Sequence, residues 1–455
     1  MRIWTRLAAL ALLLWAVMAS PVSAAASEHH LSKVVMLVRH GIAAPAADAR
    51  LPGITGKAWP QWPVGPGQLS ERGALLLTAQ WAALRGLYLE AGLLPVRQTQ
   101  ERVFVRADNT PASRASAEAL LRGLAPGSLP AYAIVNTATD PLFEPVQAGL
   151  AIFNPAETAL AILDHVNGDF SQLWETLGEP MALLDQLTGP LTPETCRSIN
   201  LPADCRLSDM TPGISIMDRG RRVEIRGGLG MGAHLVDLLL QEYAQWPQQD
   251  AAWGQANAAA LRKLLPVHSE ISNALYRTPL IAGIYGGPLL RDMALALYSQ
   301  HADPRLNEAR CAVFVGNESN LAAVGALLGV SWQASGFPVN ALPPGAVLVM
   351  ELWEGPDKAA EVRFRFFLQG LDFMHAPLDV TTAGGYRTAP AAYGPALLEA
   401  RVTLDGRDGA PALDSAAFEQ RVRGALAGRS IPRITFLPEM VSPQAPTAPS
   451  APVQP

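Results

Sequence analysis

The sequence predicts an α/β protein, and three observations support this fold class. Apolar runs typical of buried strands stand at residues 34–38, near the N-terminus, and at residues 346–352, far along the chain. Between them, residues 150–256 have the pattern of helices joined by loops that contain proline and glycine. The chain has 455 residues, 49% of them hydrophobic, which is enough to bury a large core.

The N-terminus has the pattern of a secretory signal peptide. Arg2 and Arg6 flank a short n-region, residues 7–18 are almost wholly apolar, and Val22-Ser23-Ala24 offers a small-residue cleavage site. The apolar run is too short for a transmembrane helix, and the polar residues 27–30 disfavour a retained anchor. We expect residues 1–24 to be removed by cleavage after Ala24. The mature protein should then be periplasmic or secreted, with no membrane attachment.

The first predicted strand runs directly into Arg39-His40-Gly41, and Pro45 follows four residues later. In open α/β sheets, ligands bind beyond the carboxyl ends of the strands. A guanidinium can hold phosphate or carboxylate oxygens, and an imidazole can attack phosphorus or carry a proton. The pair therefore predicts a phosphate-handling site, although a solvated strand end shows the same pattern.

The segment Arg39-His40-Gly41-Ile42-Ala43-Ala44-Pro45 resembles the signature Arg-His-Gly-x-Arg-x-Pro of the histidine acid phosphatases at four of its five defining positions. Within that family it is similar to the bacterial periplasmic phytase and glucose-1-phosphatase group. The resemblance runs from about residue 33 to about residue 440. It includes the segments at residues 59–63, 68–73, 139–145, 277–279 and 316–321.

This resemblance implies a mixed, largely parallel central sheet flanked by helices, with an inserted, mainly α-helical domain. We place the α/β core at residues 31–140 and 256–440 and the insertion at residues 141–255, where loops would set substrate specificity. The run at residues 362–368 alternates charged and apolar side chains, as an edge-like or half-exposed strand does.

The resemblance also implies roles for four residues. His40 is the expected nucleophile, and Arg39 is expected to hold the phosphate. The C-terminal His-Asp pair of the family aligns with Asn317-Glu318, so Glu318 is expected to be the general acid and Asn317 to bind a phosphate oxygen. Because His40 must be neutral and Glu318 protonated, we expect an acidic pH optimum.

Much of the family's positive charge is missing from the expected pocket. The second arginine of the signature is Ala43, and a downstream arginine aligns with Ala112 when Asp108 and Glu118 are matched to their family counterparts. Loss of one such donor typically costs about 2.7–4 kcal/mol in barrier height. Nearby arginines could compensate, and we take Arg114 and Arg277 as candidate phosphate-binding residues, with Arg50 and Arg106 as further possibilities.

The cysteines are few. Cys196 and Cys205 lie nine positions apart, in a loop short enough to close and similar to a disulfide loop of the bacterial phytases, so we expect them to form a disulfide. Cys311, in the apolar run at residues 311–315, is expected to be a free, buried thiol. Three cysteines are too few and too far apart for a zinc site, and we expect no metal and no other cofactor.

Three further segments allow simple predictions. Residues 230–240 open a strongly apolar helix, on which we expect His234 to be a core histidine. The basic run at residues 219–222 is expected in a solvated hairpin. The tail at residues 441–455, rich in proline, alanine and serine, is expected to be disordered.

The net charge of −5 is spread along the chain, which argues against nucleic acid and anionic membranes as partners. We expect a small-molecule phosphate ester as substrate and no obligate protein partner. The favoured hypothesis is a histidine acid phosphatase that hydrolyses phosphomonoesters through a phosphohistidine on His40. The alternatives are a catalytically impaired family member that binds a ligand in the periplasm, and a hydrolase or transferase acting on a less charged substrate.

Overall fold

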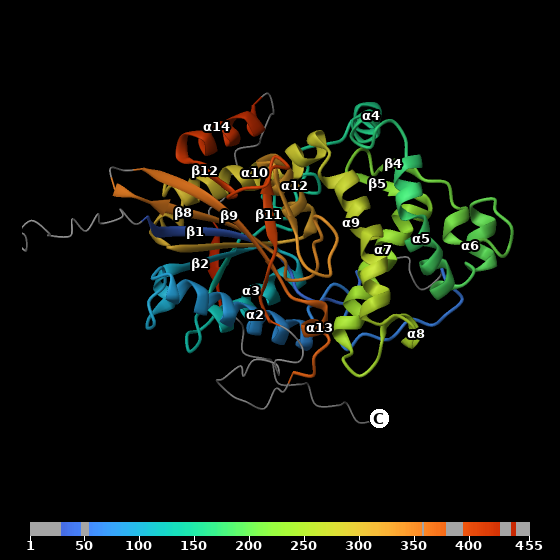
Figure 1. Cartoon of the computed structure of the whole chain (residues 1–455), viewed down its shortest axis with the longest axis horizontal. Coiled ribbons are helices and arrows are strands. Elements are labelled where there is room, and N and C mark those ends of the chain that lie inside the picture. The colour runs from blue at the N-terminus through green and yellow to red at the C-terminus, as the bar shows by residue number, and fades with distance from the viewer. Residues whose placement is uncertain (1–28, 47–53, 357–358, 379–394, 428–437, 443–455) are drawn as a thin grey trace, which may run out of the picture.

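The structure is a computed structural model of the chain, and it describes residues 29–46, 54–356, 359–378, 395–427 and 438–442. The predicted signal peptide, Arg50 and the tail beyond residue 442 lie outside the described residues. Figure 1 shows a sheet layered with helices on one side of the molecule and a group of helices on the other.

The central sheet has the strand order β10-β9-β8-β1-β6-β2-β3-β13. Its four central strands are parallel: β1 (His30–Arg39), β6 (Cys311–Gly316), β2 (Val103–Ala107) and β3 (Tyr132–Ile134). The outer strands are antiparallel to their neighbours: β8 (Val347–Glu354), β9 (Ala360–Leu368), β10 (Leu398–Glu399), β12 (Ala412–Asp414) and β13 (Glu439–Val441). The predicted mixed sheet with a parallel centre and flanking helices is confirmed.

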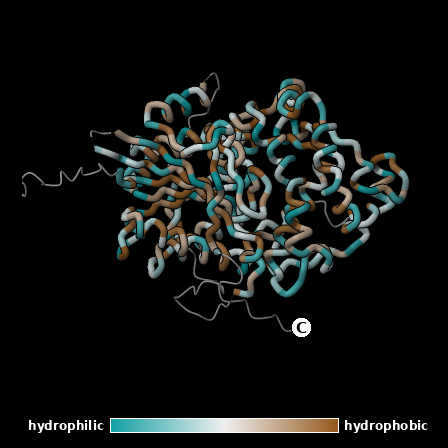
Figure 2. Tube along the Cα trace, viewed as in Figure 1, coloured by the Kyte–Doolittle hydropathy of each residue, from teal (hydrophilic) through white to brown (hydrophobic). Residues whose placement is uncertain are grey.

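Strand β1 forms because its side chains are buried on both faces of the sheet. Val34, Met36 and Val38 belong to the core beneath α2 (Glu71–Glu90) and α3 (Pro111–Leu124). Val35 and Leu37 belong to the larger core, with α10 (Pro279–Leu297) and α12 (Glu318–Leu328). The hydropathy colouring of Figure 2 shows brown, apolar segments along the strands in the middle of the sheet.

Strand β9 alternates in burial as predicted. Val362, Phe364 and Phe366 are buried, whereas Arg363 and Arg365 are partly exposed. The strand is half-exposed, and it pairs with β8 on one side and with the short β10 and β12 on the other.

The group of helices on the right of Figure 1 contains α4 (Pro155–His165), α5 (Ser171–Thr188), α6 (Pro193–Ser198), α7 (Gly227–Gln245), α8 (Ala251–Gly254) and α9 (Ala258–Tyr276). Helix α9 packs against both α5 and α7. Strands β4 (Gly213–Met217) and β5 (Arg222–Arg226) form a hairpin whose turn carries the exposed Arg219 and Arg221, so the predicted solvated hairpin is confirmed. The domain boundaries at residues 141 and 255 stay a prediction.

The remaining elements are short, apart from α14 (Ser415–Leu426), which packs on α10. They are η2 (Thr99–Arg102), η3 (Leu207–Asp209), α11 (Pro304–Glu308), β7 (Val330–Gln333), α13 (Leu371–Met374) and β11 (Arg401–Leu404). Strands β7 and β11 pair with each other outside the main sheet.

The cysteine predictions are confirmed. Cys196 and Cys205 form a disulfide across their nine-residue separation, and Cys311 is free and buried in β6. Burial raises the pKa of the Cys311 thiol to about 12, so this group stays protonated and unreactive. Helix α10 is long and apolar enough to cross a membrane by length and composition, but 72% of that stretch is buried inside the protein, as in a core helix.

Candidate active site

Three parallel neighbouring strands end at the same edge of the sheet and bring the predicted residues there. In the register of β1 and β6, Arg39 lies opposite Gly316. The backbone N–H of His40 donates to the Gly316 carbonyl at 2.9 Å, and that of Asp108, after β2, donates to the Val315 carbonyl at 2.9 Å. His40, Asn317 and Asp108 therefore lie next to the carboxyl ends of adjacent strands, as expected for an α/β ligand site.

The imidazole of His40 is held in one tautomer. Its Nδ1 lies 2.9 Å from the Gly41 carbonyl oxygen, which can only accept, so Nδ1 carries the hydrogen and Nε2 carries a lone pair. Burial, followed by the charge of Arg39, lowers the pKa of His40. Gly41 is itself fixed, because its N–H donates to Ser116 Oγ at 3.0 Å. His40 is therefore a neutral base with a free nucleophilic nitrogen.

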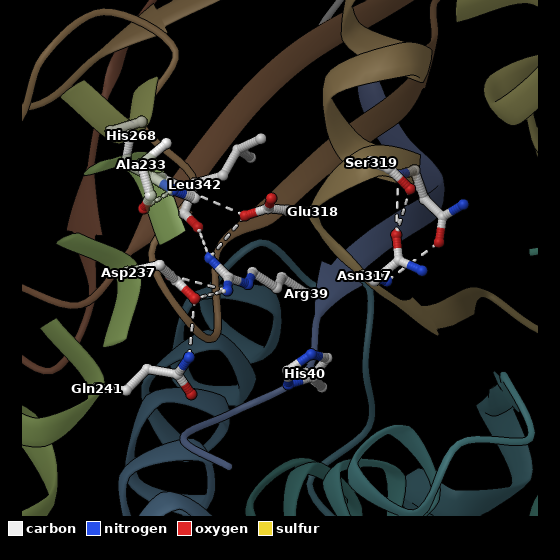
Figure 3. A network of polar contacts seen from close by, with 12 residues as sticks. Arg39, His40, Ala233, Asp237, Gln241, His268, Asn317, Glu318, Ser319 and Leu342 are labelled. Carbon is white, nitrogen blue, oxygen red and sulfur yellow. Dashed lines mark hydrogen bonds and ion pairs between the residues drawn. The ribbon is translucent and has the colours of Figure 1, made fainter. Parts of the chain in front are cut away.

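Arg39 is buried, and carbonyl and carboxylate oxygens surround its guanidinium (Figure 3). One terminal nitrogen donates to the Leu342 carbonyl at 2.5 Å and lies 3.2 Å from Glu318 Oε2. The other donates to both carboxylate oxygens of Asp237 at 3.0 Å. Burial acts to lower the pKa of Arg39, but Asp237 and Glu318 outweigh it and raise the pKa. The positive charge of Arg39 is thus balanced by two carboxylates.

Glu318 is the first residue of α12 and is held between two cationic groups. Its Oε2 lies 2.9 Å from His268 Nε2 and 3.2 Å from the Arg39 guanidinium. Burial acts to raise the pKa of Glu318, but His268 and Arg39 outweigh it and hold the pKa well below its usual range. The N-terminus of a helix also favours a carboxylate. In the resting protein Glu318 is therefore ionised.

The sequence did not point to two residues of this network, His268 and Asp237. His268 on α9 also places its Nδ1 3.2 Å from the Ala233 carbonyl of α7, and although burial opposes it, Glu318 and Asp237 raise its pKa to about 9. Asp237 accepts a hydrogen bond from Gln241, one turn later on α7, at 2.8 Å. Only the spacing of Asp237 and Gln241 could have indicated that two polar side chains of α7 act together, because residues four apart lie on the same face of a helix. Nothing in the sequence indicated that α9 faces α12 here.

Asn317 is the N-cap of α12. Its side-chain oxygen accepts from the Asn320 N–H at 3.3 Å and from Ser319 Oγ at 2.6 Å, and its own N–H donates to Asn320 Oδ1 at 3.1 Å. These bonds fix the start of the helix and hence the position of Glu318. The oxygen of Asn317 is used in capping, so only its amide nitrogen is left to serve a ligand.

His234 differs from the prediction. Rather than lying in the core, it is exposed on α7, three residues before Asp237 and therefore on the same face. Its charge favours the ionised form of Glu318. The apolar pattern of α7 suggested burial, and most residues of this helix are buried, but His234 itself is exposed.

The candidate arginines Arg114, Arg277 and Arg106 are not brought to this network. Arg114 is exposed on α3 and hydrogen-bonds Tyr132. Arg277 donates to the Val330 carbonyl at 2.9 Å and lies over the ring of Trp332. Arg277 follows His268 by nine residues, which at about 1.5 Å per residue is roughly 13 Å along a helix, so the two side chains start far apart.

Arg106 forms a buried ion pair with Asp140. Asp108 lies close enough to this neutral ion pair for the charge of Asp140 to act on it. Burial, followed by the charge of Asp140, raises the pKa of Asp108 to about 6. Arg106 therefore supplies no unbalanced positive charge to the site.

Asp237, His268 and Glu318 bring ligand atoms within 4.8 Å of one another, and such residue types can bind a metal ion. However, the Arg39 guanidinium contacts both carboxylates. A metal cation would have to share these oxygens with a buried positive charge. We therefore assign the cluster as an ion-pair network.

Comparison with known proteins gives a consistent result, although no family model matches the chain. The chain is 28% identical over 375 residues to phytase AppA of Escherichia coli (strain K12), covering 79% of this chain and 85% of that protein. It is 27% identical over 338 residues to a glucose-1-phosphatase of Salmonella typhimurium, covering 71% and 77%. The apo form of Hafnia alvei phytase superposes with a TM-score of 0.75 at 26% identity, covering 89% of this chain and 98% of that one. In sequence and fold the chain is similar to bacterial phytases and glucose-1-phosphatases, which is consistent with the histidine acid phosphatase family.

The solved phytase of Citrobacter braakii gives a similar result, with a TM-score of 0.73 at 26% identity and coverage of 87% and 98%. The two positions at which this chain departs from the expected arginines, Ala43 and Ala112, are both buried. Ala43 is buried, and its N–H donates to Gln241 Oε1 at 3.1 Å. Ala112 is buried in the first turn of α3, four residues before Ser116, which contacts Gly41. The chain thus has buried apolar side chains at the two positions where the resemblance leads us to expect arginines.

Proposed function

We propose that this protein hydrolyses phosphomonoesters through a phosphohistidine on His40. The observation that carries the proposal is the tautomer of His40, because the Gly41 carbonyl takes the Nδ1 hydrogen and leaves the Nε2 lone pair for attack on phosphorus. Similarity to a phytase and to a glucose-1-phosphatase supports phosphate esters as the substrate class.

In the first half of the reaction, Nε2 of His40 attacks phosphorus in line, and the bond from phosphorus to the ester oxygen breaks. Arg39 contacts the phosphoryl oxygens, and the carboxyl of Glu318 delivers a proton to the leaving oxygen. In the second half, water attacks the phosphohistidine, Glu318 accepts its proton, and the bonding pair returns to Nε2 of His40. Asn317 offers an amide donor to one phosphoryl oxygen.

The charge of the pocket favours a substrate with little negative charge. Arg39 and a protonated His268 balance Asp237 and Glu318, so these four groups have no net charge. A phosphate dianion is poorly stabilised without positive charge nearby. The Hafnia alvei phytase has been solved with myo-inositol hexakis sulphate, a highly charged ligand. We propose that this chain instead prefers a simple phosphomonoester in its monoanionic form.

One observation favours a second candidate, a family member that binds a ligand without turnover. Each terminal nitrogen of the Arg39 guanidinium is already bonded within the protein. A ligand would have to displace one of these contacts or use Nε, which is buried and has no partner among the described residues. Such a pocket can hold an anion without stabilising a transition state.

We also propose a periplasmic or secreted location. The predicted signal peptide supports it, and the disulfide between Cys196 and Cys205 is typical of an oxidising compartment.

The test is phosphate release by the purified mature protein from p-nitrophenyl phosphate, glucose 1-phosphate and phytate between acidic and neutral pH. We expect turnover on the simple esters, and we expect His40→Ala to abolish it because the nucleophile is gone. The matched control is His301→Asn. His301 is also a half-buried histidine near a carboxylate, Asp292 at 3.5 Å, but it lies beyond the opposite end of the sheet, before β6. Activity that survives in His40→Ala would contradict the proposal, and no turnover on any ester would favour the ligand-binding candidate.

A further inference from the structure

We propose that His268 stores the proton that Glu318 delivers to the leaving oxygen. The proposal deepens the proposed function and rests on it, because the same reaction at the same site is assumed. His268 acts through Glu318 and does not itself touch the substrate. Its part in the reaction would be to keep a proton ready at a carboxylate that cannot hold one alone.

The hydrogen bonds of His268 require both of its ring nitrogens to carry hydrogen. Nδ1 lies 3.2 Å from the Ala233 carbonyl oxygen, and Nε2 lies 2.9 Å from Glu318 Oε2 (Figure 3). A carbonyl oxygen and an ionised carboxylate are both acceptors. Since a neutral imidazole has one N–H, it would leave one of these contacts without a hydrogen. The imidazolium satisfies both.

Glu318 is poorly placed to hold the proton itself. The Arg39 guanidinium, 3.2 Å from Oε2, favours the carboxylate, as does the position of Glu318 in the first turn of α12. The pKa of Glu318 lies far below its usual range, while that of His268 is about 9. Between acidic and weakly alkaline pH, the proton shared by this pair therefore belongs to His268.

The charges that face His268 come from three elements. Glu318 of α12 and Asp237 of α7 favour the imidazolium, whereas Arg39 of β1 opposes it. His234 of α7, like His268, lowers the pKa of the Glu318 carboxyl. The two carboxylates outweigh the one guanidinium, so the proton is retained on His268 although the side chain is nearly buried.

The proton transfer balances in both half-reactions. As the bond to the leaving oxygen breaks, the proton on His268 Nε2 moves to Glu318 Oε2 and from there to the departing oxygen, which leaves as the alcohol. His268 is then neutral and keeps its Nδ1 hydrogen on the Ala233 carbonyl. When water attacks the phosphohistidine, its proton moves to Glu318 and then to His268 Nε2, which restores the starting state.

Two substrates that differ in their leaving group test this proposal. An alkoxide must be protonated as it leaves, whereas p-nitrophenolate is stable without a proton. We would therefore measure kcat/KM for glycerol 2-phosphate and for p-nitrophenyl phosphate with the wild type, His268→Asn and the control His301→Asn. The value of kcat/KM depends on the steps up to release of the alcohol or phenol, and its pH dependence reports the ionisations of the free protein and free substrate.

With glycerol 2-phosphate near neutral pH, we expect His268→Asn to lower kcat/KM by about 10²- to 10⁴-fold, the usual contribution of a general acid. With p-nitrophenyl phosphate we expect a loss of less than about 10-fold. Since the second pKa of a phosphomonoester is about 6, kcat/KM for the alkyl ester is expressed per concentration of the substrate monoanion. The alkaline limb of the wild-type profile should then lie near pH 9, where His268 loses its proton. In His268→Asn the limb should move to acidic pH, because Glu318 alone must hold the proton.

Equal losses on both substrates would assign His268 a structural role only and would overturn the proposal, as would no loss on either. Turnover that is absent in the wild type would overturn the proposed function together with this inference. Nitrogen NMR of the intact protein gives a second readout that needs no turnover and no variant of His268. We expect the His268 ring to be an imidazolium at pH 7.5 in the wild type and neutral in Glu318→Gln; a neutral ring in the wild type would overturn the proposal.

Discussion

Single residues determine how much positive charge the candidate site could offer to a phosphate. Arg39 keeps the position that the family signature gives it, but Asp237 and Glu318 balance its charge. Ala43 and Ala112 add none, and Arg114 and Arg277 are bonded elsewhere. His40, the proposed nucleophile, is present while the surrounding positive charge is small, so we expect a slow enzyme that added positive charge can accelerate.

Restoring one arginine should therefore raise activity. Ala112 lies on the face of α3 that carries Ser116, whose hydroxyl contacts Gly41 beside His40. An arginine at this position would place a guanidinium at the phosphate. We expect Ala112→Arg to raise kcat/KM for p-nitrophenyl phosphate by about 10²-fold, the usual effect of one such donor.

The matched variant is Arg114→Ala, two residues along the same helix. Arg114 is exposed and bonded to Tyr132, so its removal should change kcat/KM by less than about twofold, within what surface substitutions usually do. A large loss in Arg114→Ala, or an Ala112→Arg protein that is folded by its thermal unfolding curve and no faster, would show that the account of the missing charge is wrong.

At the scale of elements, the structure shows which parts of the site the sequence can predict. His40 directly follows the strongly apolar strand β1. Glu318 comes shortly after the apolar strand β6 and directly after the capping residue Asn317. The local sequence pattern and the family signature therefore locate both residues. These residues meet because β1 and β6 are parallel neighbours, which the α/β pattern anticipates.

The partners on the helical side could not be predicted in the same way. His268 and Asp237 come from α9 and α7, and they reach Glu318 and Arg39 only through tertiary packing of these helices beside the sheet. The apolar pattern of α7 even suggested that His234 is buried, because hydropathy does not reveal which face of a helix borders a pocket. The candidates Arg114 and Arg277 show the same limit, since the sequence does not fix the direction in which a side chain points.

At the scale of the whole molecule, the ion-pair network joins the sheet to the group of helices, so its charge state affects global stability. The pKa of His268 is about 9 in the folded protein, against about 6.5 when unfolded. Because folding raises this pKa, its stabilising contribution is complete below about pH 6.5 and is lost as the pH rises toward 9. A difference of about 2.5 pKa units at about 1.4 kcal/mol each corresponds to roughly 3 kcal/mol.

We therefore expect the free energy of unfolding of the wild type to fall by about 3 kcal/mol more than that of His268→Asn between pH 6.5 and 9. Urea titrations at several pH values measure this difference. Other groups that titrate in this range, such as Lys33, whose burial lowers its pKa to about 8, are common to both proteins and cancel. Parallel stability curves for the two proteins would contradict the ion-pair network.

The central claim is that His40 becomes phosphorylated, and trapping the phosphohistidine tests it most directly. In Glu318→Gln, p-nitrophenolate should still leave, because it needs no proton, but attack by water should be slow, so the intermediate should accumulate. After quenching in alkaline denaturant, we expect mass spectrometry to find a phosphate on the peptide that contains His40, and none when His40→Ala is added. Release of p-nitrophenol with no phosphate on that peptide would contradict the account.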